Sequence, residues 1–176
     1  GLAVVRVPKA ETRDQIDEVA KVIDRLETRA GLAPASIGIV PTIESAAGLL
    51  HVPAIAGAAR VRAFAFGAPD FVRDIGADPA SADAATQWAR QYLVVASRAA
   101  GVAAPIASVH TAVKDLDGLR RTTEEARALG FFGRSCIHPT QVPIIQEVFT
   151  PGPDQVAAAR AVLEAWDREL ARGVAA

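Results

Sequence analysis

The sequence has a single cysteine, Cys136, among its 176 residues, so no internal disulfide can form and the chain fits a reducing compartment. Its 19 basic and 20 acidic residues give a net charge of -1, without the basic excess that neutralises a phosphate backbone. The chain also lacks an uninterrupted apolar run of about 18 residues, which a membrane helix requires. Its first residues are too few and too soon interrupted to form a signal peptide. These absences predict a cytoplasmic protein that binds neither nucleic acid nor a membrane.

Several catalytic signatures are also absent. The sequence has no G-x-S-x-G, H-E-x-x-H or P-loop pattern, which removes three large classes of enzyme. It has no G-x-G-x-x-G after its first β-rich segment, which weighs against a dinucleotide-binding sheet. Small charged molecules therefore remain as partners.

The sequence does contain β-rich segments that alternate with longer helical segments. With 51% apolar residues the chain can bury a substantial core, and one domain is the default. Alternation of this kind predicts a parallel sheet covered by helices. The expected strands cover residues 3–7, 37–41, 61–66, 104–107 and 131–137. Two architectures fit, a five-stranded doubly wound sheet or part of an eight-stranded βα barrel, and five units cannot close a barrel by themselves.

Helical signals are strongest after the first strand, where Thr12 and Gln15 have the spacing of a capping box. A helix over residues 45–59 should break near His51 and Pro53. Apolar residues at helical steps predict the inward faces of the longer helices. They are Ile16, Val19, Ile23 and Leu26 in the first helix, Trp88, Tyr92, Val95 and Ala99 in a helix over 81–100, Leu116, Leu119, Ala126 and Leu129 in a helix from 115, and Val156, Ala159, Leu163, Trp166 and Leu170 in the last helix.

Two acidic residues, Glu44 and Asp70, follow the second and third expected strands and are 26 residues apart, about the length of one strand-plus-helix unit. If both strands belong to one parallel sheet, both carboxylates emerge at the same end and can share a divalent cation. Two carboxylates, completed by waters and a substrate oxygen, are a common way to hold Mg²⁺. The alternative is that Glu44 only begins a helix and Asp70 only forms a turn.

Other candidates lie near expected strand ends. Lys9 follows the first strand and His138 follows the last, where barrels place functional side chains. Arg6 lies within the first strand and would need a partner anion if it were buried. Cys136 and His138 could form a thiol-histidine pair, although a buried cysteine acting as a small hydrophobe is the commoner case.

Six segments occur together in the order and spacing of one family. They are V-P-K-A-E at 7–11, I-E-S-A-A-G-L-L at 43–50, F-G-A-P-D-F at 66–71, K-D-L-D-G-L at 114–119, I-H-P-T-Q at 137–141 and V-F-T-P at 148–151. On these segments the chain resembles the citrate lyase β-subunit-like proteins of the HpcH/HpaI aldolase family over essentially its whole length.

The resemblance implies a TIM (β/α)8 barrel in which Glu44 and Asp70 bind Mg²⁺ and carry the chemistry. It implies reversible cleavage of a carbon–carbon bond in a 3-hydroxyacyl-CoA thioester of the citryl-, malyl- or citramalyl-CoA type, giving an acyl-CoA enolate and an oxo acid. Substrate contacts are expected from Lys9 and His138 and from the backbone N–H groups around Gly67, Ala68 and Pro69. It also implies a homotrimer or a multiple of one.

The resemblance has departures as well. The family often has Glu at the position of Pro69 and Asp at the position of Ala107. Three βα units expected before residue 1 are missing, together with the family's arginine that grips the substrate carboxylate. The chain is therefore expected to consist of a partial barrel over 1–150, which supplies strands four to eight of the family fold, and a C-terminal helix over 151–176. An acyl-CoA thioester hydrolase on the same scaffold and a non-catalytic assembly subunit remain as alternatives.

Overall fold

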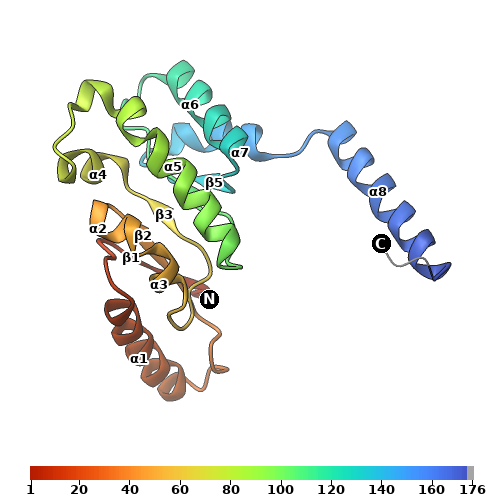
Figure 1. Cartoon of the computed structure of the whole chain (residues 1–176), viewed down its shortest axis with the longest axis horizontal. Helices are drawn as coiled ribbons and strands as arrows, with labels where there is room; N and C mark the ends of the chain where they lie inside the picture. Colours follow the sequence, from red (N-terminus) through yellow and green to blue (C-terminus); the bar gives the residue numbers. More distant parts are fainter. Residues whose placement is uncertain (174–176) are drawn as a thin grey trace.

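Five parallel strands form one sheet in which every strand lies beside the strand that follows it in the chain (Figure 1). The computed structural model describes residues 1–173. The strands are β1 (Val4–Val7), β2 (Gly38–Ile43), β3 (Ala65–Phe66), β4 (Ile106–Ala107) and β5 (Gly133–Arg134). A doubly wound sheet would reverse its strand order at a switch point. The order β1-β2-β3-β4-β5 has no reversal, so the sheet is wound in one direction like a barrel wall.

Except for the last, the helices form one layer in the same order. They are α1 (Arg13–Ala30), α2 (Ala46–Leu50), α3 (Val52–Ala56), α4 (Ala68–Asp74), α5 (Ala82–Ala99), α6 (Leu116–Leu129), α7 (Val142–Phe149) and α8 (Pro153–Ala171), with short 3-10 turns η1 (Pro79–Ser81) and η2 (Pro139–Gln141). Helix α1 contacts α3, α3 contacts α5, α5 contacts α6, and α6 contacts α7. Helices that follow one another around the sheet are the arrangement of a barrel.

The sheet is also curved, as one contact between its two edges shows. Arg6 of β1 donates from Nη1 to Oγ of Ser135, which directly follows β5, at 2.8 Å. Across a flat sheet β1 and β5 would lie about 19 Å apart, four strand spacings, and an arginine side chain could not bridge them. The chain therefore forms an arc of five βα units of a barrel, which confirms the expected fold class and excludes the doubly wound alternative.

The core lies between β2 and the helices that cover it. All six residues of β2 are buried. The largest fully buried apolar side chains are Phe64, Phe66, Ile16, Ile39, Ile43, Leu49, Ile55, Leu93, Leu119 and Val52. All of them except Leu119 belong to one continuous core, which also includes Ala107, Ala126 and Phe131 and so ties the strand ends to the helices.

Strands β3, β4 and β5 are shorter than the sequence predicted. Only Ala65–Phe66 is regular strand in the segment 61–66, although Val61 still bridges to Ile39. Backbone hydrogen bonds continue on both sides of this segment, since Arg62 N donates to Ile39 O and Ile106 N donates to Phe64 O. The pairing is therefore interrupted rather than absent.

Two helix boundaries follow the sequence signals closely. Thr12 and Gln15 form the expected capping box at the start of α1, and Gly31 ends the helix with a left-handed φ of 64°. The segment 45–59 breaks at His51 into α2 and α3, as Pro53 predicted.

The inward faces of four helices differ from the expectation, and the face predicted for the last helix is wrong throughout, because every residue of α8 is exposed. In α1 Leu26 is 51% exposed and the neighbouring carboxylate of Glu27 is buried instead. In α5 Trp88 is 59% exposed and stacks on Tyr92, while the buried face carries Thr86, Ala89, Leu93, Ala96 and Ser97. In α6 Leu116 is exposed. The buried face of α5 thus carries mostly small side chains, and Trp88 is left on the outer face.

Glu27 is buried because the protein surrounds its carboxylate with donors. Its Oε1 accepts from Ile37 N at 2.8 Å and from Ser36 Oγ at 3.0 Å, and its Oε2 accepts from Ala35 N at 3.0 Å. Arg60 donates to both oxygens, at 2.9 and 2.6 Å, and also contacts Asp24. The Arg60 guanidinium is the main reason that the pKa of Glu27 falls to about 2, and Glu27 in turn raises the pKa of Arg60.

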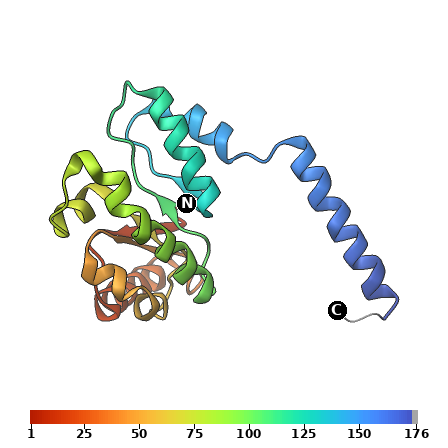
Figure 2. The same ribbon diagram turned by 45° about the horizontal axis from the view of Figure 1, so that its top comes forward.

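Helix α8 extends away from the rest of the protein (Figures 1 and 2). All of its residues are exposed, including the apolar side chains of Val156, Val162, Leu163, Trp166 and Leu170. The expected C-terminal segment includes residues 174–176, which lie outside the described residues. None of the helices formed by residues 1–173 is both long and apolar enough to span a membrane.

Candidate functional site

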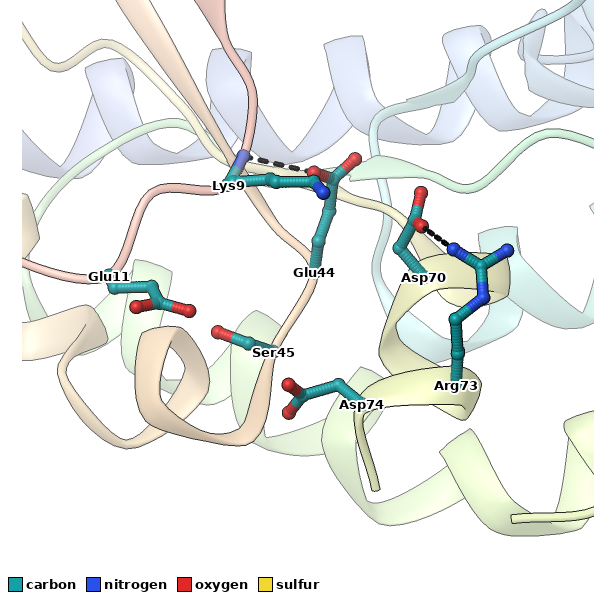
Figure 3. Close-up of a pocket in the computed structure, with 7 residues that line it drawn as sticks. All are labelled: Lys9, Glu11, Glu44, Ser45, Asp70, Arg73 and Asp74. Carbon is teal, nitrogen blue, oxygen red and sulfur yellow. Dashed lines mark hydrogen bonds and ion pairs between the residues drawn. The ribbon is translucent and has the colours of Figure 1, made fainter. Parts of the chain in front are cut away.

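A pocket of about 210 Å³ lies where β1, β2 and β3 end, and Figure 3 shows the side chains that line it. The carboxylates of Glu44 and Asp70 point to the same side of this pocket, with Lys9 over the first and Arg73 beside the second. The lining residues are Lys9, Glu11, Glu44, Ser45, Asp70, Arg73 and Asp74. The parallel sheet thus brings together the two carboxylates and the lysine that follow its first three strands.

The backbone fixes the position of Glu44. Glu44 directly follows β2, and its Oε2 accepts a hydrogen bond from Lys9 N at 2.9 Å. Lys9 has a left-handed backbone with a φ of 51°, which is unfavourable for a residue with a side chain. The turn after β1 therefore accepts strain and presents its N–H group to the Glu44 carboxylate.

Gly67 allows the close approach of the next strand to Glu44. A Cβ atom at Gly67 would lie 2.5 Å from Cγ and 2.7 Å from Oε1 of Glu44, closer than any such pair can pack. Glycine is required here because the backbone and the carboxylate occupy the space that a side chain would need.

Replacing Gly67 with Ala should therefore move the Glu44 carboxylate. We expect Gly67→Ala to weaken Mg²⁺ binding by the full-length protein at least about 10-fold, the low end of the effect of losing support for a metal ligand. Calorimetric titration with MgCl₂ measures this affinity. The control is Gly133→Ala, since a Cβ at Gly133 would meet nothing within 4 Å. Equal affinities for the two variants would contradict the requirement for close packing.

Asp70 is the third residue of α4, which begins directly after β3. Its Oδ1 accepts from Arg73 Nη1 at 2.7 Å, and the Asp70 and Arg73 side chains are 41% and 78% exposed. Asp74, one turn after Asp70, accepts a hydrogen bond from Ala46 N and so ties α4 to the start of α2. Neither Arg73 nor Asp74 was predicted as a site residue, although their i+3 and i+4 spacing from Asp70 on a helix would have indicated them.

The backbone around Gly67 is less available to a ligand than expected. Gly67 N already donates to Ile43 O at 2.9 Å, and Ala68 N donates to Ser108 Oγ at 2.9 Å. Pro69 has no N–H group. Ala68 and Pro69 line a neighbouring cavity of about 500 Å³ rather than the carboxylate pocket. In this segment the expected anion contacts are therefore limited to Asp70 N, for which the structure gives no acceptor.

His138 lies away from the carboxylates. It caps η2, where its Nδ1 is 2.9 Å from Thr140 Oγ1 and accepts from Thr140 N, and it does not line the carboxylate pocket. Cys136 is exposed rather than buried, so the expectation of a small buried hydrophobe is wrong. Arg6 is exposed and hydrogen-bonds to Ser135 and Thr42, so it has no need of a buried anion.

The donor set of the pocket fits a hard divalent cation. Within residues 1–173 no group of three or more His, Cys, Asp or Glu side chains is placed to hold a metal ion. Glu44 and Asp70 can supply two carboxylates, and Mg²⁺ commonly binds through one or two carboxylates with waters and substrate oxygens. The remaining coordination positions of the metal would therefore be filled by water or substrate.

Comparison with known proteins gives consistent matches. Residues 1–139 match the family described as HpcH/HpaI aldolase/citrate lyase. The chain is 31% identical to the citrate lyase subunit beta of Escherichia coli over 99% of its own length and 58% of that protein. It is 34% identical to the mitochondrial citramalyl-CoA lyase of Rattus norvegicus over 78% of its own length and 44% of that protein.

A solved structure supports the same relationship. The structure of CitE from Mycobacterium tuberculosis in complex with magnesium, acetoacetate and coenzyme A is 28% identical, with a TM-score of 0.71, over 95% of this chain and 58% of that one. The chain thus spans 44–58% of the length of these relatives. The matched family, the shared identity and the common fold agree, and the chain belongs to the HpcH/HpaI aldolase/citrate lyase family.

Proposed function

We propose that the pocket is the metal-binding part of the active site of a Mg²⁺-dependent carbon–carbon lyase that acts on a 3-hydroxyacyl-CoA thioester. One observation carries the proposal: Glu44 and Asp70 leave adjacent parallel strands and line one pocket with Lys9. The names of the relatives support the reaction class, because they include citrate lyase, citramalyl-CoA lyase and L-malyl-CoA/β-methylmalyl-CoA lyase.

Glu44 and Asp70 would hold the Mg²⁺ ion. When bound, Mg²⁺ offsets the negative charge that develops on the oxo acid's oxygens as the carbon–carbon bond breaks or forms. Lys9 N orients Glu44 from one side, and Arg73 holds Asp70 from the other. Within residues 1–173 each carboxylate keeps one oxygen without a hydrogen bond, Oε1 of Glu44 and Oδ2 of Asp70, and these oxygens are the expected ligands.

Substrate binding would rest on positive groups at the same strand ends. Lys9 and Arg73 line the pocket and carry the charge that attracts an anionic substrate such as an oxo acid. Asp70 N is placed near the start of α4, where the helix favours negative charge. Contacts of Gly67, Ala68, Pro69 and His138 with the substrate stay predictions.

Removal of the metal tests the proposed reaction directly. We expect EDTA to reduce cleavage of malyl-CoA or citramalyl-CoA by the full-length protein to background and added Mg²⁺ to restore it. The products are followed as an acyl-CoA and an oxo acid by chromatography. Release of free CoA without an oxo acid would identify a thioester hydrolase instead. Absence of both turnover and Mg²⁺ binding would favour an assembly subunit.

The arrangement of the whole protein belongs to the same proposal. We propose that residues 1–150 supply strands four to eight of a complete barrel and that residues 151–176 form a helical extension. A cytoplasmic homotrimer, or a multiple of one, is expected. The exposed apolar side chains of α8 are consistent with a segment that packs against further protein.

A further inference from the structure

A second polar cavity, of about 90 Å³, lies between α5, α6 and the ends of β4 and β5. Arg90 of α5, Arg134 of β5 and His110 of the loop after β4 line it, together with Ser108, Ala107 and Asp83. None of its lining residues lines the carboxylate pocket. The cavity also includes Ala68, an expected substrate contact, so it adjoins the carboxylate pocket without sharing its lining. Anion binding in it can be tested independently of the proposed lyase activity.

Buried side-chain nitrogens without hydrogen-bond partners lie at this cavity. Among residues 1–173 three buried side-chain nitrogens lack a hydrogen-bond partner: Nε of Arg90, Nε2 of His110 and Nε of Arg134. All three residues line the cavity. The nearest carboxylate oxygen to His110 Nε2 is Asp115 Oδ2, at 3.6 Å, which is too long for a hydrogen bond. Buried polar groups are nearly always paired in native proteins, so three orphans at one cavity indicate a missing acceptor.

The two guanidinium groups also lack a counter-ion among the described residues. Arg90 donates from Nη2 to Asp83 O at 3.2 Å, and Arg134 donates from Nη2 to Thr122 O at 2.7 Å. Both acceptors are neutral carbonyl groups, and neither arginine forms a salt bridge within residues 1–173.

The surrounding charges do not neutralise this pair. Burial, and then repulsion from Arg90, lower the pKa of Arg134 to about 10. The carboxylates of Asp83 and Glu125 oppose this shift, but Asp83 is exposed at the rim and Glu125 is paired with Arg121. The cavity thus holds two arginines whose positive charge the protein leaves largely uncompensated.

We propose that this cavity binds a small oxyanion, such as inorganic phosphate, between the guanidinium groups of Arg90 and Arg134. A guanidinium presents N–H groups in a planar fork that matches the oxygens of phosphate or carboxylate. Ser108 accepts from Ala68 N at 2.9 Å, which leaves its hydroxyl hydrogen for the anion. A water molecule needs about 10–15 Å³ of such space, so the cavity holds an ion of a few atoms with some water and is too small for a nucleotide.

Thermal unfolding of the full-length protein in phosphate tests the proposal. We expect phosphate to raise the Tm above its value in sodium chloride of equal ionic strength, because a ligand bound only by the folded state stabilises it. Acetate in a parallel series distinguishes a carboxylate ligand from phosphate. Calorimetric titration with phosphate should give a Kd for Arg134→Gln that is at least 10-fold larger than that of the wild type. The matched control is Arg98→Gln, an exposed arginine on α5, which should bind phosphate like the wild type.

A complementary variant supplies the missing charge from the protein. Ala107 is buried and lines the cavity, so Ala107→Asp places a carboxylate among the arginines. We expect this variant to have a raised Tm without phosphate and no response to phosphate. If Arg134→Gln fails to fold, the response of the Tm to phosphate in Arg90→Gln and in Ala107→Asp still tests whether the cavity binds the anion. A Tm that responds equally to phosphate in the wild type and in these variants, or no response in the wild type, would overturn the proposal.

Discussion

The substitution Asp70→Asn should abolish Mg²⁺-dependent cleavage of an acyl-CoA substrate by the full-length protein while leaving its fold intact. Asparagine has nearly the shape of aspartate but lacks the negative charge that makes a carboxylate the stronger ligand for a divalent cation. Loss of an outer-shell partner typically costs 10–100-fold in metal affinity or activity. Loss of one of only two carboxylate ligands should therefore cost more than about 100-fold. Steady-state assays at several Mg²⁺ concentrations measure the loss.

The structure also indicates that Asp70→Asn will remain folded. Asp70 forms an ion pair with Arg73, and both side chains are substantially exposed. Exposed pairs of this kind contribute about 0–1 kcal/mol, so the Tm should change little.

Two control variants separate the role of the charge from that of the pair. Arg73→Gln removes the ion pair and keeps the carboxylate, so it should lose less Mg²⁺ binding than Asp70→Asn. Asp167→Asn changes an exposed aspartate on α8 and should behave like the wild type. Unchanged turnover in Asp70→Asn would show that the carboxylate is not a metal ligand.

The sequence predicted the architecture well because local signals and the barrel's connectivity agree. The capping box at Thr12 begins α1, and Pro53 separates α2 from α3. Glu44 and Asp70 could be paired from sequence alone, because every parallel strand ends at the same edge of its sheet. The alternation of strands and helices could not choose between a barrel and a doubly wound sheet. That choice needed the strand order and the reach of Arg6 to Ser135.

Features that depend on distant contacts could not be predicted. Helical periodicity places Trp88 and Tyr92 on one face, but only the tertiary structure shows that Trp88 is exposed while Tyr92 packs partly against the core. Gly67 was expected to offer its N–H to a substrate, whereas the sheet uses that group and the missing side chain makes room for Glu44. Both errors arise because a side chain's surroundings come from segments far away in the chain.

Glu27 is a further example, since a glutamate on a helix is normally a surface residue. Its partner Arg60 lies 33 residues later, and their side chains are 2% and 5% exposed. Arg60 has a left-handed backbone with a φ of 69°. The ion pair, and the backbone donors around it, hold the loop before β2 against the end of α1.

The substitution Arg60→Ala should therefore cause a large loss of stability. Removing one partner of a buried ion pair typically costs about 3–5 kcal/mol, because the other charge stays buried without compensation. Alanine keeps the Cβ atom, so the strain of the left-handed backbone is the same in both proteins. Urea unfolding of the full-length protein measures the free energy of unfolding. Arg25→Ala, on the exposed face of α1, is the control and should lie within about 0.5 kcal/mol of the wild type.

The pH dependence of the stability shows whether the loss of stability in Arg60→Ala arises from the charge of Glu27. The pKa of Glu27 is about 2 in the folded protein, below its ordinary value of 4.5, so the ionised group stabilises the fold above pH 4.5. This stabilisation is lost as the pH falls from 4.5 towards 2. Arg60 is the largest cause of the lowered pKa, so Arg60→Ala should lose less stability than the wild type as the pH falls. The difference in stability between the wild type and Arg60→Ala should therefore narrow over this range. A stability difference that stays constant with pH would mean that Arg60 acts through packing rather than through its charge. In that case the double variant Glu27→Gln/Arg60→Ala should be no more stable than Arg60→Ala alone.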